Sequence, residues 1–407
     1  MRIAIVAPLC ETVPPSKYGG TERVIHYIVE ELVRLGHTVT LYAASGSKTS
    51  AKLIECYDGT FRDHGIVPGM AEIKDGNTVQ LKLAMSDPTH DIIHVHHGID
   101  PYHARILDIT RPVPIVWTDH NAVHILDKPK DLIALAKLDI GLTALSESHR
   151  STVPEAKWLT TIHHGLPVNM LTPREVTPTY LAFLGRISPE KGINSAIRIS
   201  EAAGFELKVA AKIDKTDQTF YEEEVKPHLD ACRVDFIGEI SDEEKGPFLS
   251  GAIALVFPIC WLEPFGLVMI EAMACGCPVV AFRMGSAPEV IEDGVTGFLV
   301  DTEEEAVEAL RHIGMLDRKR IRQRFEERFT STTMAKKYVD MYERVIKEAN
   351  AAREAKELET AFAIQETKKA GKLYNQRVIK GVSTRETVVN TCNLDDITNI
   401  TYRLTLK

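Results

Sequence analysis

The stretch AIALVFPICWLEPFGLVMIEAMACGCPVVAF, residues 252–282, places an apolar helical segment between two short apolar runs. The runs at 252–259 and 278–282 have the length and β-branched content of buried strands. Gly276 ends the segment between them, as glycine commonly does at a helix carboxyl terminus. Two parallel strands joined by a helix form the repeating unit of an α/β sheet, so the stretch predicts that fold class.

The same alternation of apolar strands and amphipathic helices runs through most of the chain. A stretch rich in proline, threonine and polar residues near 166–178 divides it into two similar series, and we interpret this stretch as a linker. The pattern predicts two Rossmann-like, doubly wound domains at residues 1–170 and 171–330. The strands expected from apolar runs are 2–8, 38–44, 91–97, 114–119, 140–146, 180–186, 206–212, 233–239, 252–259, 278–282 and 297–301.

The last part of the chain differs from both series. Residues 331–370 have the pattern of one or two long amphipathic helices, which leaves two uses open: bracing the amino-terminal domain or forming a homodimer. Residues 371–407 form a tail of unknown role, whose final segment alternates β-branched and polar residues like strands or loosely ordered chain.

Composition excludes several classes of protein. The chain has 407 residues, 44% of them hydrophobic, and a formal net charge of −9, which argues against nucleic acid or an anionic membrane as partner. Its seven dispersed cysteines favour reduced thiols over a disulfide framework. No apolar run reaches the ~18–20 residues of a membrane-spanning helix, and the first residues read as a strand and not as a signal peptide. We therefore expect a cytoplasmic protein.

The helical segment in the opening stretch carries two carboxylates. Glu263 precedes the helix start at Pro264 and Gly266, where free N–H groups and the helix dipole suit a phosphate. Glu271 lies about one and a half turns inside. Because a buried carboxylate needs hydrogen-bond donors, either ligand hydroxyls or an internal cation must serve it. The sequence leaves both readings open.

Two further loops have residues suited to phosphate. Arg186 and Lys191, in GRISPEKG, follow a strand at the sheet edge where α/β proteins bind ligands, so they suit a diphosphate, although solvated loop charges are the alternative. Gly19 and Gly20 lie between the first strand and the first helix, where a glycine loop can approach phosphate closely, or simply turn.

Histidines cluster in three short motifs. In HVHH, strand alternation points His94 and His96 to one side and His97 to the other, and no carboxylate completes a ligand set, so we expect no metal site. His120, at the carboxyl end of a strand, fits a hydrogen-bonding group or weak acid or base in the cleft. The third motif is His163 with His164.

Together these motifs resemble the retaining glycosyltransferases of family 4, over about residues 1–350. The resemblance implies the glycosyltransferase-B fold, in which two Rossmann-like domains face each other across a cleft. Its strongest part is 257–300, which looks like the family's nucleotide-sugar block with the E-x7-E motif. The chain departs from the family's pattern at His164-Gly165-Leu166-Pro167 and at Gly285-Ser286. The other motifs that carry the resemblance are FLGRISPEKG (183–192), YGGTERVI (18–25), VWTDHN (116–121) and TALSES (143–148).

The resemblance implies a role for each site residue. Arg186 and Lys191 would neutralise the donor's diphosphate, Glu271 would accept hydrogen bonds from ribose, and Glu263 would bind the transferred sugar. His120 would contact the sugar near the reacting carbon. The remaining implied contacts are the backbone amides of Phe265, Gly266 and Leu267 with sugar and phosphate, Gly19 and Gly20 with the diphosphate, and 236–239 with the base.

The implied activity is transfer of a sugar, with retention, from a nucleotide sugar to an acceptor. We expect UDP-glucose or a related donor first and GDP-mannose next, with no metal and no cofactor, because cations of the protein can replace the metal. The acceptor stays open among sugars, small molecules and lipid-linked compounds, the last with a peripheral membrane position. The alternatives are a sugar phosphorylase or nucleotide-sugar epimerase on the same fold, or an inactive nucleotide-sugar-binding subunit.

Overall fold

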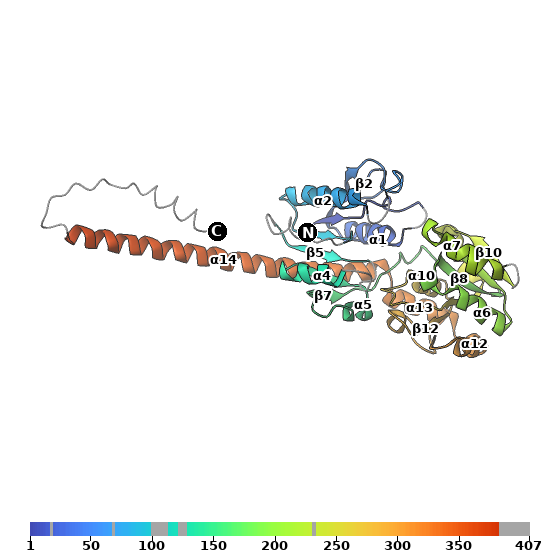
Figure 1. The fold of residues 1–407 in the computed structure, drawn as a ribbon. Coiled ribbons are helices and arrows are strands. Elements are labelled where there is room, and N and C mark those ends of the chain that lie inside the picture. The colour runs from blue at the N-terminus through green and yellow to red at the C-terminus, as the bar shows by residue number, and fades with distance from the viewer. Residues whose placement is uncertain (17–18, 67–69, 99–112, 121–127, 230–232, 382–407) are drawn as a thin grey trace. The chain divides into compact units, whose positions relative to one another are not determined.

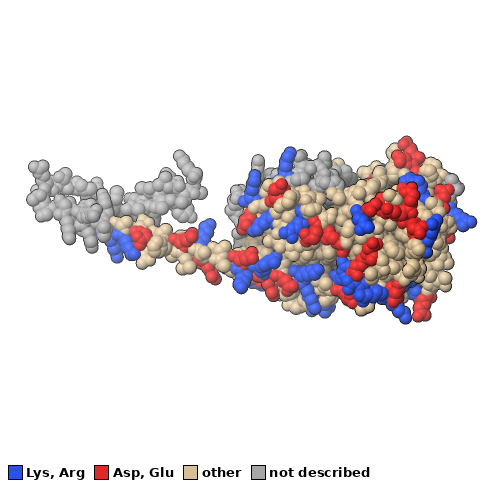
Figure 2. All heavy atoms as spheres, turned by 90° about the horizontal axis from the view of Figure 1, so that it is seen from below, with Lys and Arg blue, Asp and Glu red and all other residues tan. Residues whose placement is uncertain are grey.

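The computed structural model describes residues 1–16, 19–66, 70–98, 113–120, 128–229 and 233–381 (Figure 1). The chain forms two units, Met1–Lys347 and Glu348–Lys407. No helix within the described ranges is both long enough and apolar enough to cross a lipid bilayer. On the face of the first unit that Figure 2 shows, basic and acidic side chains are interspersed.

The first sheet has seven strands, all pairs parallel, in the order β3-β2-β1-β4-β5-β6-β7. The order reverses between β1 and β4, which is the switch point of a doubly wound sheet. Its strands are β1 (Arg2–Val6), β2 (Thr38–Ala44), β3 (Lys52–Tyr57), β4 (Ile92–Val95), β5 (Ile115–Thr118), β6 (Gly141–Ala144) and β7 (Trp158–Thr161). The helices in this part are α1 (Gly20–Arg34), α2 (Ala71–Ser86), α4 (Lys128–Lys137) and α5 (Glu147–Ser151).

The second sheet has six parallel strands in the order β10-β9-β8-β11-β12-β13, with its switch point between β8 and β11. Its strands are β8 (Tyr180–Ile187), β9 (Leu207–Ile213), β10 (Val234–Gly238), β11 (Ala252–Phe257), β12 (Val279–Phe282) and β13 (Gly297–Val300). The helices are α6 (Ile193–Ala203), α7 (Gln218–Phe220), α8 (Lys226–Leu229), α9 (Asp242–Ser250), α10 (Leu267–Ala274), α11 (Ala287–Val290), α12 (Glu303–His312), α13 (Arg318–Arg328) and α14 (Ser331–Gly381).

Parallel sheets of this kind bury both faces, and β1 shows how the sequence achieves it. Ile3 and Ile5 belong to one hydrophobic cluster and Ala4 and Val6 to another, so alternate side chains enter separate cores. The predicted α/β fold with two Rossmann-like domains is confirmed. Apolar runs did not reveal β3 and β7, because these edge strands are only partly buried.

The chain passes between the two sheets at two points that lie side by side. Leu166 pairs with Thr330 in a parallel bridge. After the second passage, the start of α14 packs on the first sheet's domain, where Tyr338 and Tyr342 are fully buried. Ser331 Oγ also donates a hydrogen bond to Glu31 Oε1 of α1 at 3.0 Å.

The end of the chain is helical further than its sequence pattern indicates. The helix α14 continues to Gly381, so the first residues of the expected tail belong to it. Side chains from 351 to 370 are all exposed. The β-like segment expected after 385 lies outside the described residues.

The end of α10 depends on a glycine in a left-handed conformation. Gly276 has φ 66°, and a Cβ atom there would lie 2.7 Å from the carbonyl oxygen of Arg318 in α13. Residues other than glycine are therefore disfavoured at position 276 for two reasons. The left-handed backbone conformation strains them, and their Cβ atom would clash with α13.

We predict that Gly276→Ala lowers the melting temperature more than Gly204→Ala. Gly204, which ends α6, has φ 75° with nothing within 4 Å of the added Cβ, so its substitution costs only the backbone strain, about 1 kcal/mol. The Gly276 substitution adds a backbone clash, and overpacking of this kind costs about 1–3 kcal/mol more. Thermal unfolding of the two variants measures the difference, and equal shifts would contradict the role of the α13 contact.

Candidate active site

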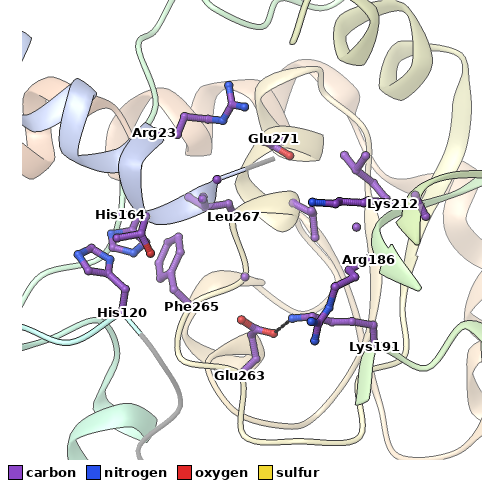
Figure 3. Close-up of a pocket in the computed structure, with 18 of the residues that line it drawn as sticks. Arg23, His120, His164, Arg186, Lys191, Lys212, Glu263, Phe265, Leu267 and Glu271 are labelled. Carbon is purple, nitrogen blue, oxygen red and sulfur yellow. Dashed lines mark hydrogen bonds and ion pairs between the residues drawn. The ribbon is translucent and has the colours of Figure 1, made fainter. Parts of the chain in front are cut away.

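A cleft of about 860 Å³ lies where the carboxyl ends of strands from both sheets meet. Its walls include the ends of β8 and β9 and the amino-terminal ends of α1 and α10. Ligands of open α/β sheets bind at such edges. The site residues singled out by number from the sequence all line this cleft: Gly19, Gly20, His120, Arg186, Lys191, Glu263, Phe265, Gly266, Leu267 and Glu271. Figure 3 labels those seen as side chains: His120, Arg186, Lys191, Glu263, Phe265, Leu267 and Glu271. Of the expected base contacts at 236–239, Glu239 lines it.

Glu271 has an internal cation as partner, which is one of the two alternatives that the sequence left open for this buried carboxylate. Its side chain is 3% exposed, and Lys245 Nζ of α9 donates a hydrogen bond to Oε1 at 2.7 Å. Lys245 also lies 3.1 Å from Asp242 Oδ1. The carboxylate nevertheless lines the cleft, so a ligand hydroxyl and an internal lysine can both serve it.

The charge chain from Glu271 continues across the cleft. Asp242, at the start of α9, forms an ion pair with Arg23 of α1. Arg23, Asp242, Lys245 and Glu271 thus connect the helix beside the Gly19-Gly20 loop to the helix that carries the inner glutamate. Local sequence patterns do not predict the Arg23–Asp242 and Lys245–Glu271 pairs, because the paired residues lie far apart in the sequence.

The outer glutamate pairs with one of the predicted phosphate-binding cations. Glu263 forms an ion pair with Lys191 and accepts a hydrogen bond from Trp261 Nε1 at 2.8 Å. The Lys191 ammonium also lies 4.7 Å from the centre of the Trp261 ring. Figure 3 shows the Lys191–Glu263 pair at one edge of the cleft.

Arg186 is held by two acidic side chains. Its guanidinium donates to Glu190 Oε1 at 2.5 Å and lies 3.5 Å from Asp217 Oδ2. Both predicted phosphate-binding cations therefore have acidic partners in the free protein. An incoming diphosphate would compete with these carboxylates for the cations.

The amino terminus of α10 is shaped by its preceding residues. Gly266 adopts φ 76°, and a Cβ atom there would lie 2.9 Å from the Met269 side chain and 3.0 Å from the Phe257 ring. Ser286 Oγ donates a hydrogen bond to the Phe265 carbonyl oxygen at 2.7 Å. Ser286, at one of the family departures, thus helps to hold this loop.

The opposite side of the cleft is formed by histidines (Figure 3). His120 follows β5, its ring stacks on that of His164 with centroids 5.3 Å apart, and the His164 ring is 5.0 Å from that of Phe265. Burial lowers the pKa of His120 to about 4, so its imidazole is neutral near pH 7. His94 and His96 lie side by side, as strand alternation predicts, and His97 packs instead on the Trp117 ring.

Glu22 is a lining carboxylate that the sequence did not single out. It lies in the first turn of α1 and is buried. Burial raises its pKa to about 7. The site therefore holds a carboxyl group near its ionisation point beside the Gly19-Gly20 loop.

The sequence of this chain matches two models of known protein families. The family model "Glycosyltransferase Family 4" matches residues 18–168, and the model "Glycosyl transferases group 1" matches residues 172–331. The chain belongs to glycosyltransferase family 4. It is 25% identical over 338 residues to a glycogen synthase of Mycobacterium tuberculosis, which covers 70% of this chain and 79% of the relative.

Solved structures show the same fold. Sucrose-phosphate synthase from Thermosynechococcus elongatus superposes with a TM-score of 0.69 at 18% identity, covering 86% of this chain and all (100%) of that one. A protein from Anabaena, whose structure is in complex with UDP and glucose, gives a TM-score of 0.65 at 20% identity, with coverages of 84% and 100%. The glycosyltransferase-B fold expected from the sequence is thus confirmed.

We predict strong energetic coupling between Lys245 and Glu271. The Glu271 side chain is only 3% exposed, so removing Lys245 leaves its charge largely buried without a partner. A cycle of Lys245→Met, Glu271→Gln and the double variant should therefore give a coupling of about 2–3 kcal/mol. The more exposed pair Arg198–Glu303, with side chains 58% and 29% exposed, provides the control. Its coupling should stay below about 1 kcal/mol. Denaturant unfolding measures both cycles, and equal couplings would contradict the buried character of the first pair.

Proposed function

We propose that this protein is a metal-independent, retaining glycosyltransferase that moves a sugar, glucose first, from a UDP-sugar to an acceptor. The observation that carries the proposal is the convergence of Arg186, Lys191, Glu263 and Glu271 with His120 in one cleft between two Rossmann-like domains. Family membership supplies the transferase activity. The roles of the residues follow from their charges and positions.

The diphosphate of the donor would lie against Arg186, Lys191 and the amino terminus of α10. Two cations and the free N–H groups of a helix start stabilise the charge that builds up on a departing nucleoside diphosphate. The first helix α1 also begins at this cleft, at Gly20. These groups supply the charge compensation that a divalent metal supplies elsewhere, which supports a metal-independent reaction.

The two carboxylates would bind different parts of the donor. Glu271, deep in α10 and held by Lys245, would accept hydrogen bonds from ribose hydroxyls. Glu263, at the loop before α10 and held by Trp261, would accept hydrogen bonds from the transferred sugar. Diphosphate binding to Lys191 would free Glu263 from its present ion pair, so phosphate and sugar recognition are linked.

Retention fits attack of the acceptor on the face from which the diphosphate leaves. The acceptor oxygen forms the new glycosidic bond while the bond to phosphate breaks, and the leaving phosphate oxygen takes the acceptor's proton. Positive charge on the sugar carbon is then balanced by the adjacent diphosphate. In this scheme neither Glu263 nor Glu271 serves as nucleophile, in contrast to the paired carboxylates of retaining glycosidases.

We predict that a UDP-sugar raises the melting temperature of the protein more than other nucleotide sugars do. Ligands that bind only the folded state stabilise it in proportion to the logarithm of their concentration over Kd. A thermal-shift panel of UDP-glucose, UDP-galactose, UDP-N-acetylglucosamine, GDP-mannose and ADP-glucose, with EDTA present, measures this. A larger shift with GDP-mannose would change the donor, and a shift that requires added Mg²⁺ would overturn metal independence.

We predict that the two glutamates divide binding and transfer between them. Glu271→Gln should weaken UDP binding about tenfold, the size of one charge-assisted hydrogen bond. Glu263→Gln should leave UDP binding within about threefold but lower the rate of UDP-glucose hydrolysis or transfer about a hundredfold, because its partner is the sugar. Calorimetry with UDP and turnover measurements separate the two effects. Glu11→Gln removes a lining carboxylate that has no assigned part in UDP binding, so it serves as the control. Unchanged UDP binding by Glu271→Gln would refute the ribose assignment.

A further inference from the structure

Glu289 of the second domain makes contacts with the first domain that the proposed function does not use. It lies in α11, the single turn of helix that follows Ser286. Its Oε2 accepts a hydrogen bond from the Glu147 amide at 2.7 Å, and its Oε1 accepts one from the Ser148 amide at 2.8 Å. Both amides belong to α5 of the first domain, so this carboxylate joins the two domains.

The start of α5 needs these acceptors, because the first N–H groups of a helix have no partner within it. Ser146 Oγ serves the third amide, that of His149, at 3.0 Å, whereas the first two amides are served by Glu289. A negative charge at this position also interacts favourably with the helix dipole. A side chain of the second domain therefore completes a helix of the first.

The same carboxylate also holds a histidine just before the linker. His163 Nε2 lies 3.1 Å from Glu289 Oε2, and since a carboxylate can only accept, the imidazole donates. Burial favours the uncharged form of Glu289, yet the hydrogen bonds from His163, Ser148 and Glu147 outweigh it and lower the pKa of the carboxyl group. Glu289 is therefore a charged acceptor of these three hydrogen bonds at neutral pH.

Within the second domain, Glu289 is one helical turn from the loop that carries the outer glutamate. The Glu289 amide donates to the Ser286 carbonyl oxygen at 2.9 Å, and the Ser286 amide donates to the Glu263 carbonyl oxygen at 3.0 Å. Ser286 Oγ also donates to the Phe265 carbonyl oxygen. The turn that carries Glu289 therefore holds the loop at 263–265, which lines the cleft.

The first-domain partners of this carboxylate adjoin the opposite wall of the cleft. His163 precedes His164, which lines the cleft, and the His163 ring is 5.7 Å from the ring of Phe265. The His164 ring also lies next to Phe265 (Figure 3). Leu145, two residues before Glu147, lines the cleft as well. The carboxylate thus bonds to chain segments of one wall and belongs to a turn that holds the other.

We propose that Glu289 is a positioning residue, which sets the spacing between the wall formed by His120 and His164 and the loop at 263–265, and so places the transferred sugar for reaction. This inference rests on the proposed function only for the identity of the substrate. A misplacement of about 1 Å can lower a rate about a hundredfold. Sugar transfer therefore depends on Glu289, although its side chain does not line the cleft, whereas UDP binding rests mainly on groups of the second domain.

Hydrogen exchange of the full-length protein tests the contact itself and requires no substrate. Peptides that cover the start of α5 should exchange at least about tenfold faster in Glu289→Ala than in wild type, because the variant removes the acceptor of two amides. Glu292→Ala is the matched control. The Glu292 side chain is similarly exposed, 28% against 21%, but it bonds to Arg324 and Arg328 of its own domain, so exchange in α5 should stay at the wild-type rate. Equal exchange in wild type and Glu289→Ala overturns the proposal.

Turnover of UDP-glucose, with calorimetry of UDP, tests the role in the reaction. Glu289→Ala should lower kcat about ten- to a hundredfold and leave the Kd for UDP within about threefold. Glu292→Ala should leave kcat within about twofold, even if it lowers the melting temperature equally, because its ion pairs do not reach the first domain. A kcat for Glu289→Ala that equals the kcat of Glu292→Ala overturns the positioning role.

The two measurements separate this inference from the proposed function. If the wild-type protein turns over another nucleotide sugar and not UDP-glucose, the proposed donor is wrong, and the same comparison of variants is made with the other donor. If Glu289→Ala does not fold, Glu289→Gln replaces it in both measurements. That variant keeps the size of the side chain but presents an N–H group where an acceptor is needed.

Discussion

The buried carboxylate of Glu271 is the constraint on which the site depends. A charge in an otherwise apolar helix needs a counter-charge, and Lys245 supplies it at 2.7 Å. Lys245 is in turn held by Asp242, and Asp242 by Arg23 from the other domain. The need to compensate the buried charge of Glu271 therefore connects α10 with α9. The ion pair of Asp242 with Arg23 then connects α9 with the start of α1. The cleft is built around that chain of charges.

Ion pairs also hold the two cations that are proposed to bind the diphosphate. Lys191 is paired with Glu263, and Arg186 with Glu190 and Asp217, so both cations proposed to bind the diphosphate already have carboxylate partners. In the proposed function, a donor with a diphosphate would displace these carboxylates from the cations. Such exchange favours ligands that present phosphate and hydroxyl groups together, since phosphate alone would leave a carboxylate without its cation.

Sequence patterns identified the residues of the cleft but not their connections. Gly266, Arg186 and Lys191 stand at or near strand and helix ends, which short-range patterns reveal. Glu271 stands out for a different reason, as a charge within an apolar helical run. The pairing of Glu271 with Lys245 joins residues 26 positions apart on different helices, and no local pattern encodes it. The edge strands β3 and β7 were not predicted either. They are half-exposed, so their sequences lack the apolar runs of central strands.

The carboxyl-terminal helix has a consequence for how such proteins can be recombined. Its first turns follow the second domain in sequence, yet Tyr342 reaches His94 beneath the first sheet, and Ser331 reaches α1. A chimaera that exchanges the nucleotide-binding half for that of a relative must therefore be cut twice, near Leu166 and near Thr330, where the two passages of the chain pair with each other. With a single junction, the helix corresponding to α14 would come from the relative and would have to pack against His94 of the original first domain. The unit of modular exchange is thus an inserted domain and not a terminal one.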